Sequence, residues 1–123
     1  MSDIRVNWFE IPVTDVERAA KFYSTLLDQE LGEMPGPDGE TMTIFPSTEG
    51  AAGALTQSED LSPGKSGPLV YLNCPDIDAA VGRCEAAGGT VVAPRTPIGE
   101  YGAIAQLVDS EGNRIALHSE SDE

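Results

Sequence analysis

A chain of 123 residues has the length of one domain, and its 40% apolar content is enough for a hydrophobic core. The 21 acidic and 7 basic residues give a net charge of −14, and such a surface repels phosphate backbones and anionic lipids, so we expect no nucleic acid or membrane partner. No apolar run approaches the roughly 20 residues of a membrane span, and no apolar signal core is seen, which predicts a cytoplasmic location.

The first half of the chain predicts a strand, a helix and two more strands. The helix is expected to begin after Thr14 or Asp15, either of which supplies an N-cap oxygen. Its apolar residues then recur at helical spacing as far as Leu27. A cluster of Pro, Gly and Asp at residues 34–40 indicates a turn. The expected strands are residues 6–13, 41–45 and 52–57.

The second half predicts a similar set of elements after a polar linker, rich in Gly and Pro, at residues 58–68. The expected helix spans residues 76–87 and is ended by two glycines. A loop is expected at residues 94–102 and an acidic tail at residues 120–123. The expected strands are residues 69–73, 90–93, 103–108 and 114–118.

The two halves look like a repeat. DVERAAKFY at Asp15 aligns with DIDAAVGRC at Asp76, and STEGAAGALT at Ser47 aligns with DSEGNRIALH at Asp109, at offsets of 61 and 62 residues. We therefore expect a single α+β domain made of two tandem β-α-β-β-β modules, about residues 4–57 and 69–119. Side by side, two such modules can curl their sheets into a curved, partly open cleft.

Three segments carry a resemblance to a known superfamily: IPVTDVERAAKFY from Ile11, DIDAAVGRCEAAGG from Asp76 and LVDSEGNRIALH from Leu107. With the doubled pattern, they resemble the vicinal oxygen chelate superfamily, which includes glyoxalase I, bleomycin-resistance proteins and extradiol dioxygenases. Within it, the chain is most similar to small single-domain proteins described only as glyoxalase-related. The resemblance implies the glyoxalase/bleomycin-resistance fold and a homodimer.

The resemblance also implies where a metal would be held. Enzymes of the superfamily place ligands on the first and last strands of each module, which correspond here to Trp8, Ala54, Leu69 and Ala116. None of these side chains can coordinate a divalent cation, so we expect no metal and no cofactor. A weak site for a divalent metal at Glu10 and His118, the chain's one histidine, stays open as an alternative.

Strand alternation predicts which side chains line the cleft, because residues two apart face the same side. Starting from the four positions above, and adding the Gly-flanked loop that holds Tyr101, the candidates form an aromatic wall with a few polar groups, as is usual for a small-molecule pocket. They are Trp8, Glu10, Thr56, Leu69, Tyr71, Asn73, Tyr101, Ala116 and His118. Each could instead be structural: Trp8 and Tyr71 as core, Glu10 as a solvent-facing residue and His118 as a hydrogen-bonded strand residue. Arg114 is expected to serve the turn or to pair with Glu111.

Three functions are compatible with this cleft. The first is binding of a small organic molecule without altering it, and a cationic guest would suit the negative field. The second is a lyase or isomerase related to glyoxalase I, in which Glu10 or His118 moves a proton with or without a weakly bound metal. The third is a regulatory module with an unused cleft. Whether one chain closes the cleft, or two chains exchange modules, is left open by the spacing.

Overall fold

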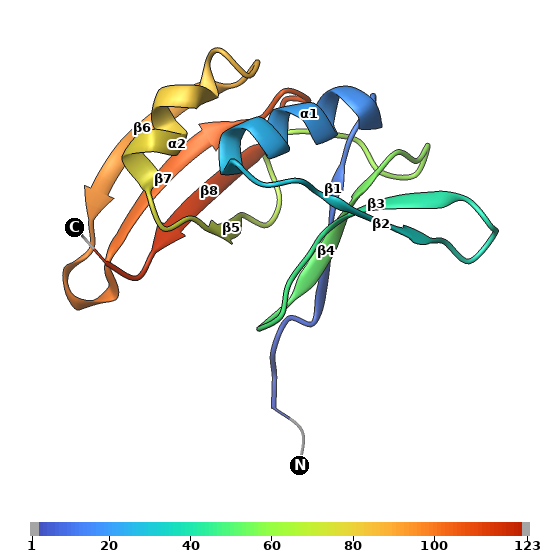
Figure 1. Ribbon diagram of the computed structural model, residues 1–123, viewed down its shortest axis with the longest axis horizontal. Helices are drawn as coiled ribbons and strands as arrows, with labels where there is room; N and C mark the ends of the chain where they lie inside the picture. The colour runs from blue at the N-terminus through green and yellow to red at the C-terminus, as the bar shows by residue number, and fades with distance from the viewer. Residues whose placement is uncertain (1–2, 122–123) are drawn as a thin grey trace.

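The computed structural model describes residues 3–121 of the chain, so part of the predicted acidic tail lies outside the described residues. Two helices and a short 3-10 helix accompany the strands in this part of the chain (Figure 1). The elements in chain order are β1 (Trp8–Pro12), α1 (Val16–Leu27), β2 (Gly32–Pro35), β3 (Thr41–Phe45), β4 (Ala52–Thr56), β5 (Val70–Asn73), α2 (Ile77–Cys84), β6 (Thr90–Pro97), η1 (Gly99–Tyr101), β7 (Ala103–Val108) and β8 (Arg114–Ser119).

The strands form two four-stranded sheets with the same topology. The first sheet has the order β1-β4-β3-β2 and the second sheet has the order β5-β8-β7-β6. In each sheet the strand before the helix pairs in parallel with the last strand of its half, and the other neighbours pair antiparallel. This repeated β-α-β-β-β order confirms the predicted α+β fold class.

Both helices begin where an aspartate caps them. The carboxylate of Asp15 accepts a hydrogen bond from the Arg18 backbone N–H at 3.1 Å, and that of Asp76 accepts one from Ala79 N–H at 3.1 Å. Each cap satisfies a backbone donor that the first turn of a helix leaves without a partner. Of the two N-cap candidates in the first half, Asp15 is therefore the correct one.

The structure differs from the expected elements mainly at the strands β2 and β6. Residues 32–35 form β2 although part of this segment was expected to be a turn, and β6 continues to Pro97 through a segment that was expected to be a loop. Both strands lie at the edge of a sheet, where proline is tolerated because the outer backbone groups need no partner. Register shifts in the β6–β7 pairing accommodate Pro94 in the same way. The helix α2 ends at Cys84, three residues earlier than expected.

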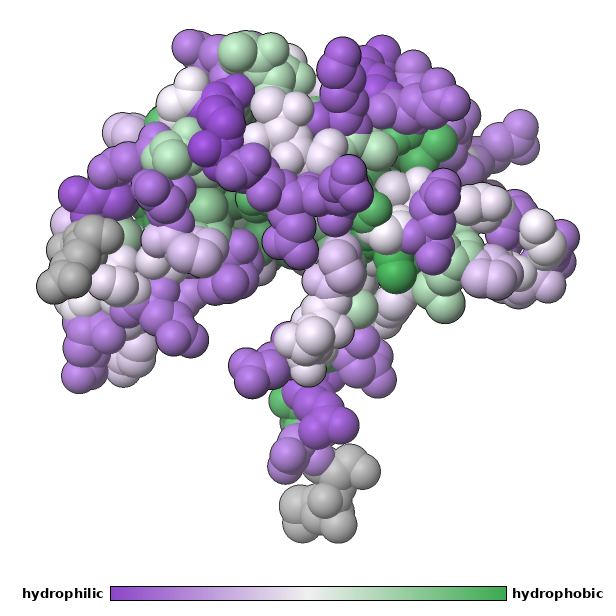
Figure 2. Space-filling model, in the orientation of Figure 1, coloured by the Kyte–Doolittle hydropathy of each residue, from purple (hydrophilic) through white to green (hydrophobic). Residues whose placement is uncertain are grey.

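One hydrophobic core joins the two halves. Phe22 and Tyr23 of α1 are fully buried, as are Cys84 of α2 and Leu107 and Leu117 of the second sheet, and all belong to the same cluster. The two helices pack on each other, and each sheet turns one face toward this core. In Figure 2, hydrophilic residues cover most of the visible surface and hydrophobic ones show mainly in the middle of the molecule. Among residues 3–121, neither helix has the length and apolar character needed to cross a bilayer.

Candidate functional site

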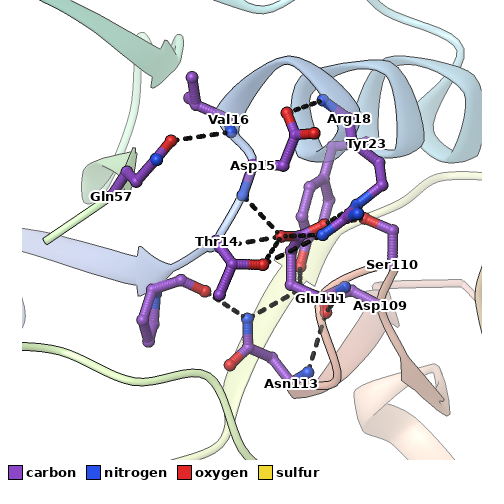
Figure 3. Close-up of polar contacts among 11 residues, drawn as sticks. Thr14, Asp15, Val16, Arg18, Tyr23, Gln57, Asp109, Ser110, Glu111 and Asn113 are labelled. Carbon is purple, nitrogen blue, oxygen red and sulfur yellow. Dashed lines mark hydrogen bonds and ion pairs between the residues drawn. The ribbon is translucent and has the colours of Figure 1, made fainter. Parts of the chain in front are cut away.

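The turn between β7 and β8 ties the second half of the chain to the start of α1, with Glu111 at its centre (Figure 3). The Glu111 carboxylate accepts hydrogen bonds from the Thr14 backbone N–H at 2.9 Å and hydroxyl at 3.0 Å, and from the Asp15 N–H at 3.0 Å. It also accepts two bonds from the Arg18 guanidinium, from Nε at 2.7 Å and from Nη2 at 2.9 Å. The fork of the guanidinium therefore pairs with both carboxylate oxygens.

The environment of Glu111 keeps it ionised. The Arg18 guanidinium lowers the pKa of the Glu111 carboxyl from 4.5 to about 2; burial opposes this shift, and the bonds from Thr14 and Asp15 support it. The Glu111 side chain is fully covered, whereas 53% of the Arg18 side chain is exposed. The Glu111 carboxylate is the desolvated partner of the pair. Its charge is therefore stable only while these hydrogen-bond donors remain in place.

A second carboxylate of the same turn, Asp109, joins the turn to the buried side of α1. The Tyr23 hydroxyl donates to Asp109 Oδ2 at 2.5 Å, and the Asn113 amide bonds both that oxygen at 3.0 Å and the Pro12 carbonyl at 2.7 Å. Burial, with the adjacent Asp109 charge, raises the pKa of Tyr23 well above its ordinary value of 10, so the phenol stays protonated as a donor. The D-x-E-G-N turn is thus a structural joint that fixes the two halves relative to each other.

Trp8 and Glu10 lie on the face of the first sheet that is turned away from the core. Phe9 and Ile11 of β1 belong to the core or pack against it, so the residues between them point the other way. Trp8 is 38% exposed, and its indole N–H donates to Glu10 Oε2 at 3.2 Å. An aromatic ring and a carboxylate are therefore held together at the surface.

The same face continues onto the neighbouring strands. The register places Ala54 beside Glu10 on one side and beside Ile44 on the other, and it places Thr56 beside Pro12. Ala54 is fully buried although its side chain is on this face. We call this surface the first open face and define it by Trp8, Glu10, Ile44, Ala54 and Thr56.

The corresponding face of the second sheet is more polar. Ala116 of β8 lies between Tyr71 of β5 and Gln106 of β7, so these three residues form one row across the sheet. His118, two residues further along β8, pairs with Asn73. Ala116 is fully buried, whereas Tyr71 is 48% exposed. The second open face is defined by Tyr71, Asn73, Gln106, Arg114, Ala116 and His118.

A groove of about 1130 Å³ runs between the two sheets. Its walls include Phe9, Leu27 and Phe45 from the first half of the chain. From the second half it takes three of the sequence-predicted residues, which are Leu69, Tyr71 and Asn73. The other predicted residues do not line it; they are Trp8, Glu10, Thr56, Tyr101, Ala116 and His118. In one chain, the predicted cleft residues therefore do not share one groove: Trp8, Glu10 and Thr56 lie on the first sheet, and the others lie in the second half of the chain.

The loop that carries Tyr101 touches the second open face through its backbone. The Tyr101 carbonyl oxygen lies 2.8 Å from His118 Nε2, so this ring nitrogen carries the proton and donates. The Tyr101 ring itself is 69% exposed. His118 is therefore held as a hydrogen-bonded residue at the edge of the face.

Arg114 is the residue that sequence reasoning placed wrongly. It was expected to serve the turn or to pair with Glu111, but Glu111 bonds Arg18, and Arg114 Nη2 donates instead to Gln106 Oε1 at 2.6 Å. Gln106 was not predicted at all. Alternation along β8 does lead from Ala116 to Arg114, two residues before it, and the pairing of Gln106 with Ala116 is the signal that could have found the glutamine.

The residues present do not fit a metal ion at the positions implied by the resemblance. Trp8, Ala54 and Ala116 occupy the open faces, and Leu69 lines the groove, so none offers a coordinating atom. Among residues 3–121, no group of three or more His, Cys, Asp or Glu side chains could hold a metal. Glu10 lies on the first sheet and His118 on the second.

Comparison with known proteins identifies the family. The model of the glyoxalase/bleomycin resistance protein/dioxygenase superfamily matches residues 5–117. The chain belongs to this superfamily. A glyoxylase-like domain-containing protein of Didymella fabae is 32% identical over 123 residues, covering 92% of this chain and 91% of that protein. The predictions of a glyoxalase-like family and of the glyoxalase/bleomycin-resistance fold are therefore confirmed.

Two further relatives differ in how much of them the chain spans. A Mycobacterium bovis protein named "Putative glyoxylase CFP32" is 28% identical over 114 residues, which cover 90% of this chain but only 44% of that protein. TnmS3, an antibiotic binding protein from Streptomyces, has a crystal structure that matches with a TM-score of 0.69 at 27% identity, covering 97% of this chain and 98% of that one. This chain therefore matches TnmS3 over nearly the whole length of both proteins. It spans less than half of the mycobacterial relative.

Proposed function

We propose that this protein binds a small organic molecule reversibly, without a metal ion, on the open faces of its sheets. The observation that carries the proposal is the chemistry of four positions: Trp8, Ala54, Leu69 and Ala116 stand where a metal-dependent relative would hold its ligands. Three of these side chains lie on the open faces, so the surface that a metal would occupy is apolar or aromatic. Apolar and aromatic surface with few polar groups suits an organic ligand.

Trp8 and Glu10 favour an aromatic or cationic guest on the first open face. The indole is partly exposed and its N–H is directed to the Glu10 carboxylate at 3.2 Å, so a cation above the ring would meet both the π-face and a negative charge. The net charge of −14 attracts such a guest over longer distances. The likeness to TnmS3, an antibiotic binding protein, supports binding as the class of function.

A homodimer completes the proposed cleft. In one chain the two open faces do not line a common groove, and both leave aromatic residues exposed, Trp8 at 38% and Tyr71 at 48%. A second copy that lays one face against the other would cover these rings and enclose a ligand between Trp8 and Tyr71. Sedimentation equilibrium tests this step: a dimer is expected, and a protein that stays monomeric at micromolar concentration with ligand present would contradict it.

The binding proposal is tested by titration of the single tryptophan. Aromatic, cationic and aldehyde-adduct compounds are screened by thermal shift, and each hit is then titrated while Trp8 fluorescence is followed. Binding is expected to change Trp8 emission in a saturable way, with equal affinity before and after treatment with a chelator. If no compound of the set binds, the proposal is refuted. If a chelator abolishes binding, the claim that no metal ion is needed is refuted.

The name of the mycobacterial relative, "Putative glyoxylase CFP32", favours a lyase or isomerase instead. In that case Glu10 on the first sheet or His118 on the second would move a proton. A hemithioacetal isomerisation assay separates the two functions. Turnover that falls in Glu10→Gln and survives in Glu33→Gln, an exposed glutamate of β2, would establish the enzyme and displace the binding proposal.

A further inference from the structure

Arg114 on the second open face has a donor without an acceptor. Its Nη2 donates to Gln106 Oε1 at 2.6 Å, but its Nε is buried and has no hydrogen-bond partner. Two ion pairs within residues 3–121, Arg18 with Glu111 and Arg95 with Asp78, do not include Arg114. The residue as a whole is half-buried.

This arrangement differs from that of three other arginines of the chain. Arg18 and Arg95 pair with carboxylates, and Arg83 donates Nε–H and Nη2–H to the carbonyl oxygens of Thr25 and Leu26. Gln106 supplies a neutral oxygen instead, and the buried Nε–H is left unpaired. A buried donor without an acceptor is unfavourable, so a methionine or glutamine at 114 would pack at less cost unless another group reaches Nε.

The surroundings of Arg114 gather further donors around a small residue. Gln106 uses its oxygen to accept from Arg114, which leaves its amide N–H groups for another partner. Ala116, in the row between Gln106 and Tyr71, places no bulk at the centre of the face. Tyr71 is 48% exposed at the other end of that row. Donors at one end and an exposed ring at the other suit a molecule with an anionic head and an apolar body.

We propose that Arg114 and Gln106 form a subsite for a carboxylate group of the bound molecule. One carboxylate oxygen takes the second hydrogen of Nη2, and a rotation of the guanidinium brings the Nε–H to the other oxygen, while the amide of Gln106 donates alongside. This fork geometry matches a planar carboxylate. Phosphate fits the same fork but brings up to two negative charges to a single guanidinium on a protein of charge −14, so the carboxylate is favoured. The inference rests on the proposed binding function and names the chemistry of one end of the ligand.

The test compares carboxylates with their neutral amides. Benzoate, phenylacetate and indole-3-acetate, the three matched carboxamides and inorganic phosphate are titrated into the full-length protein. The Nε–H signal of Arg114 is followed by NMR after its assignment from Arg114→Lys, which retains the charge but loses the fork. Arg114→Met removes both, and Lys21→Gln, at an exposed position of α1, is the control for the loss of one positive charge.

The carboxylates are expected to bind at least about tenfold more tightly than the amides and to shift the Arg114 Nε–H signal. Arg114→Met should remove this preference, Arg114→Lys should keep part of it, and Lys21→Gln should keep it all. Equal binding of acids and amides, or a preference that survives in Arg114→Met, would overturn the subsite and leave the binding function standing. Tighter binding of phosphate would overturn the choice of carboxylate. No binding of any compound, neutral or charged, would overturn both proposals.

Discussion

Replacing Glu111 by glutamine tests whether the joint between the two halves depends on a charged carboxylate. The variant keeps the size of the side chain and one oxygen that can accept from Thr14 or Asp15. It loses the negative charge that pairs with both nitrogens of the Arg18 fork. We therefore expect a destabilised protein that still folds.

The magnitude follows from the pKa of Glu111. The difference between the ordinary value of 4.5 and about 2 corresponds to about 3.4 kcal/mol in the free energy of unfolding, at 1.36 kcal/mol for each pKa unit. Half of the Arg18 side chain is exposed to solvent, which screens the pair, so we expect about 2 kcal/mol for Glu111→Gln at pH 7. This loss should lower Tm by roughly 5 to 10 °C in a domain of this size.

The contribution of Glu111 to the free energy of unfolding decreases as the pH falls. Because the folded-state pKa of Glu111 is lowered, its contribution is complete above pH 4.5 and is lost as the pH falls toward about 2. The wild type should therefore lose its advantage over Glu111→Gln on acidification, by roughly 1 kcal/mol between pH 6 and pH 3.5. Comparison with the variant cancels the titration of the other carboxylates.

Urea unfolding of both proteins between pH 7 and pH 3.5 measures these differences. Glu17→Gln, an exposed glutamate in the first turn of α1, is the matched control and should change the free energy of unfolding by less than about 0.5 kcal/mol. If Glu111→Gln is as stable as the wild type at pH 7, or if its deficit does not shrink in acid, the carboxylate is not what holds the joint together.

Three further predictions use other parts of the molecule. Trp8→Ala should abolish the ligand-induced rise in Tm, while Val92→Ala, which also truncates an exposed apolar residue, should retain it; equal ligand responses would remove Trp8 from the site. Gly102→Ala should cost about 2–4 kcal/mol in urea unfolding because a Cβ there would collide with the Ser119 carbonyl oxygen and φ is +101°, whereas Gly64→Ala, with open space around it, should be near neutral. Burial raises the pKa of the Cys84 thiol to about 11, so an aromatic disulfide reagent at pH 8 should leave it unmodified until denaturant is added; rapid modification of the native protein would contradict this.

The repeat made most of the fold predictable. Two local signals, an aspartate before an apolar stripe and a turn before a last strand, recur at nearly one spacing, and each marks the same element in both sheets. The strands β2 and β6, each at one edge of its sheet, were the exception. β2 and β6 contain Pro35 and Pro94, which read as turn or loop residues in sequence, yet an edge strand needs backbone bonds on one side only. Residue type alone therefore predicted the wrong structure for these two segments. Their structure depends on the place of each strand in its sheet.

Candidate site residues were predictable only as far as alternation reaches. Residues two apart on a regular strand face the same side of the sheet. This alternation places Trp8 with Glu10 on β1, and Tyr71 with Asn73 on β5. It does not say which partner a charged side chain will choose. Glu111 is three residues from Arg114 but binds Arg18, 93 residues away, because the fold brings the start of α1 to the turn. Because Glu111 bonds Arg18, Arg114 bonds Gln106 on the second open face instead.

The two repeats use one architecture with opposite charge. Ala54 and Ala116 occupy equivalent places, 62 residues apart, and each is a fully buried small residue on an open face. Glu10 lies beside the first and Gln106, with Arg114 bound to it, lies beside the second. Two copies that set these faces together would bring an acidic aromatic surface against a basic one. A ligand between them would meet a carboxylate at one end and a guanidinium at the other, so opposite charges on the two ends of one molecule would both be matched.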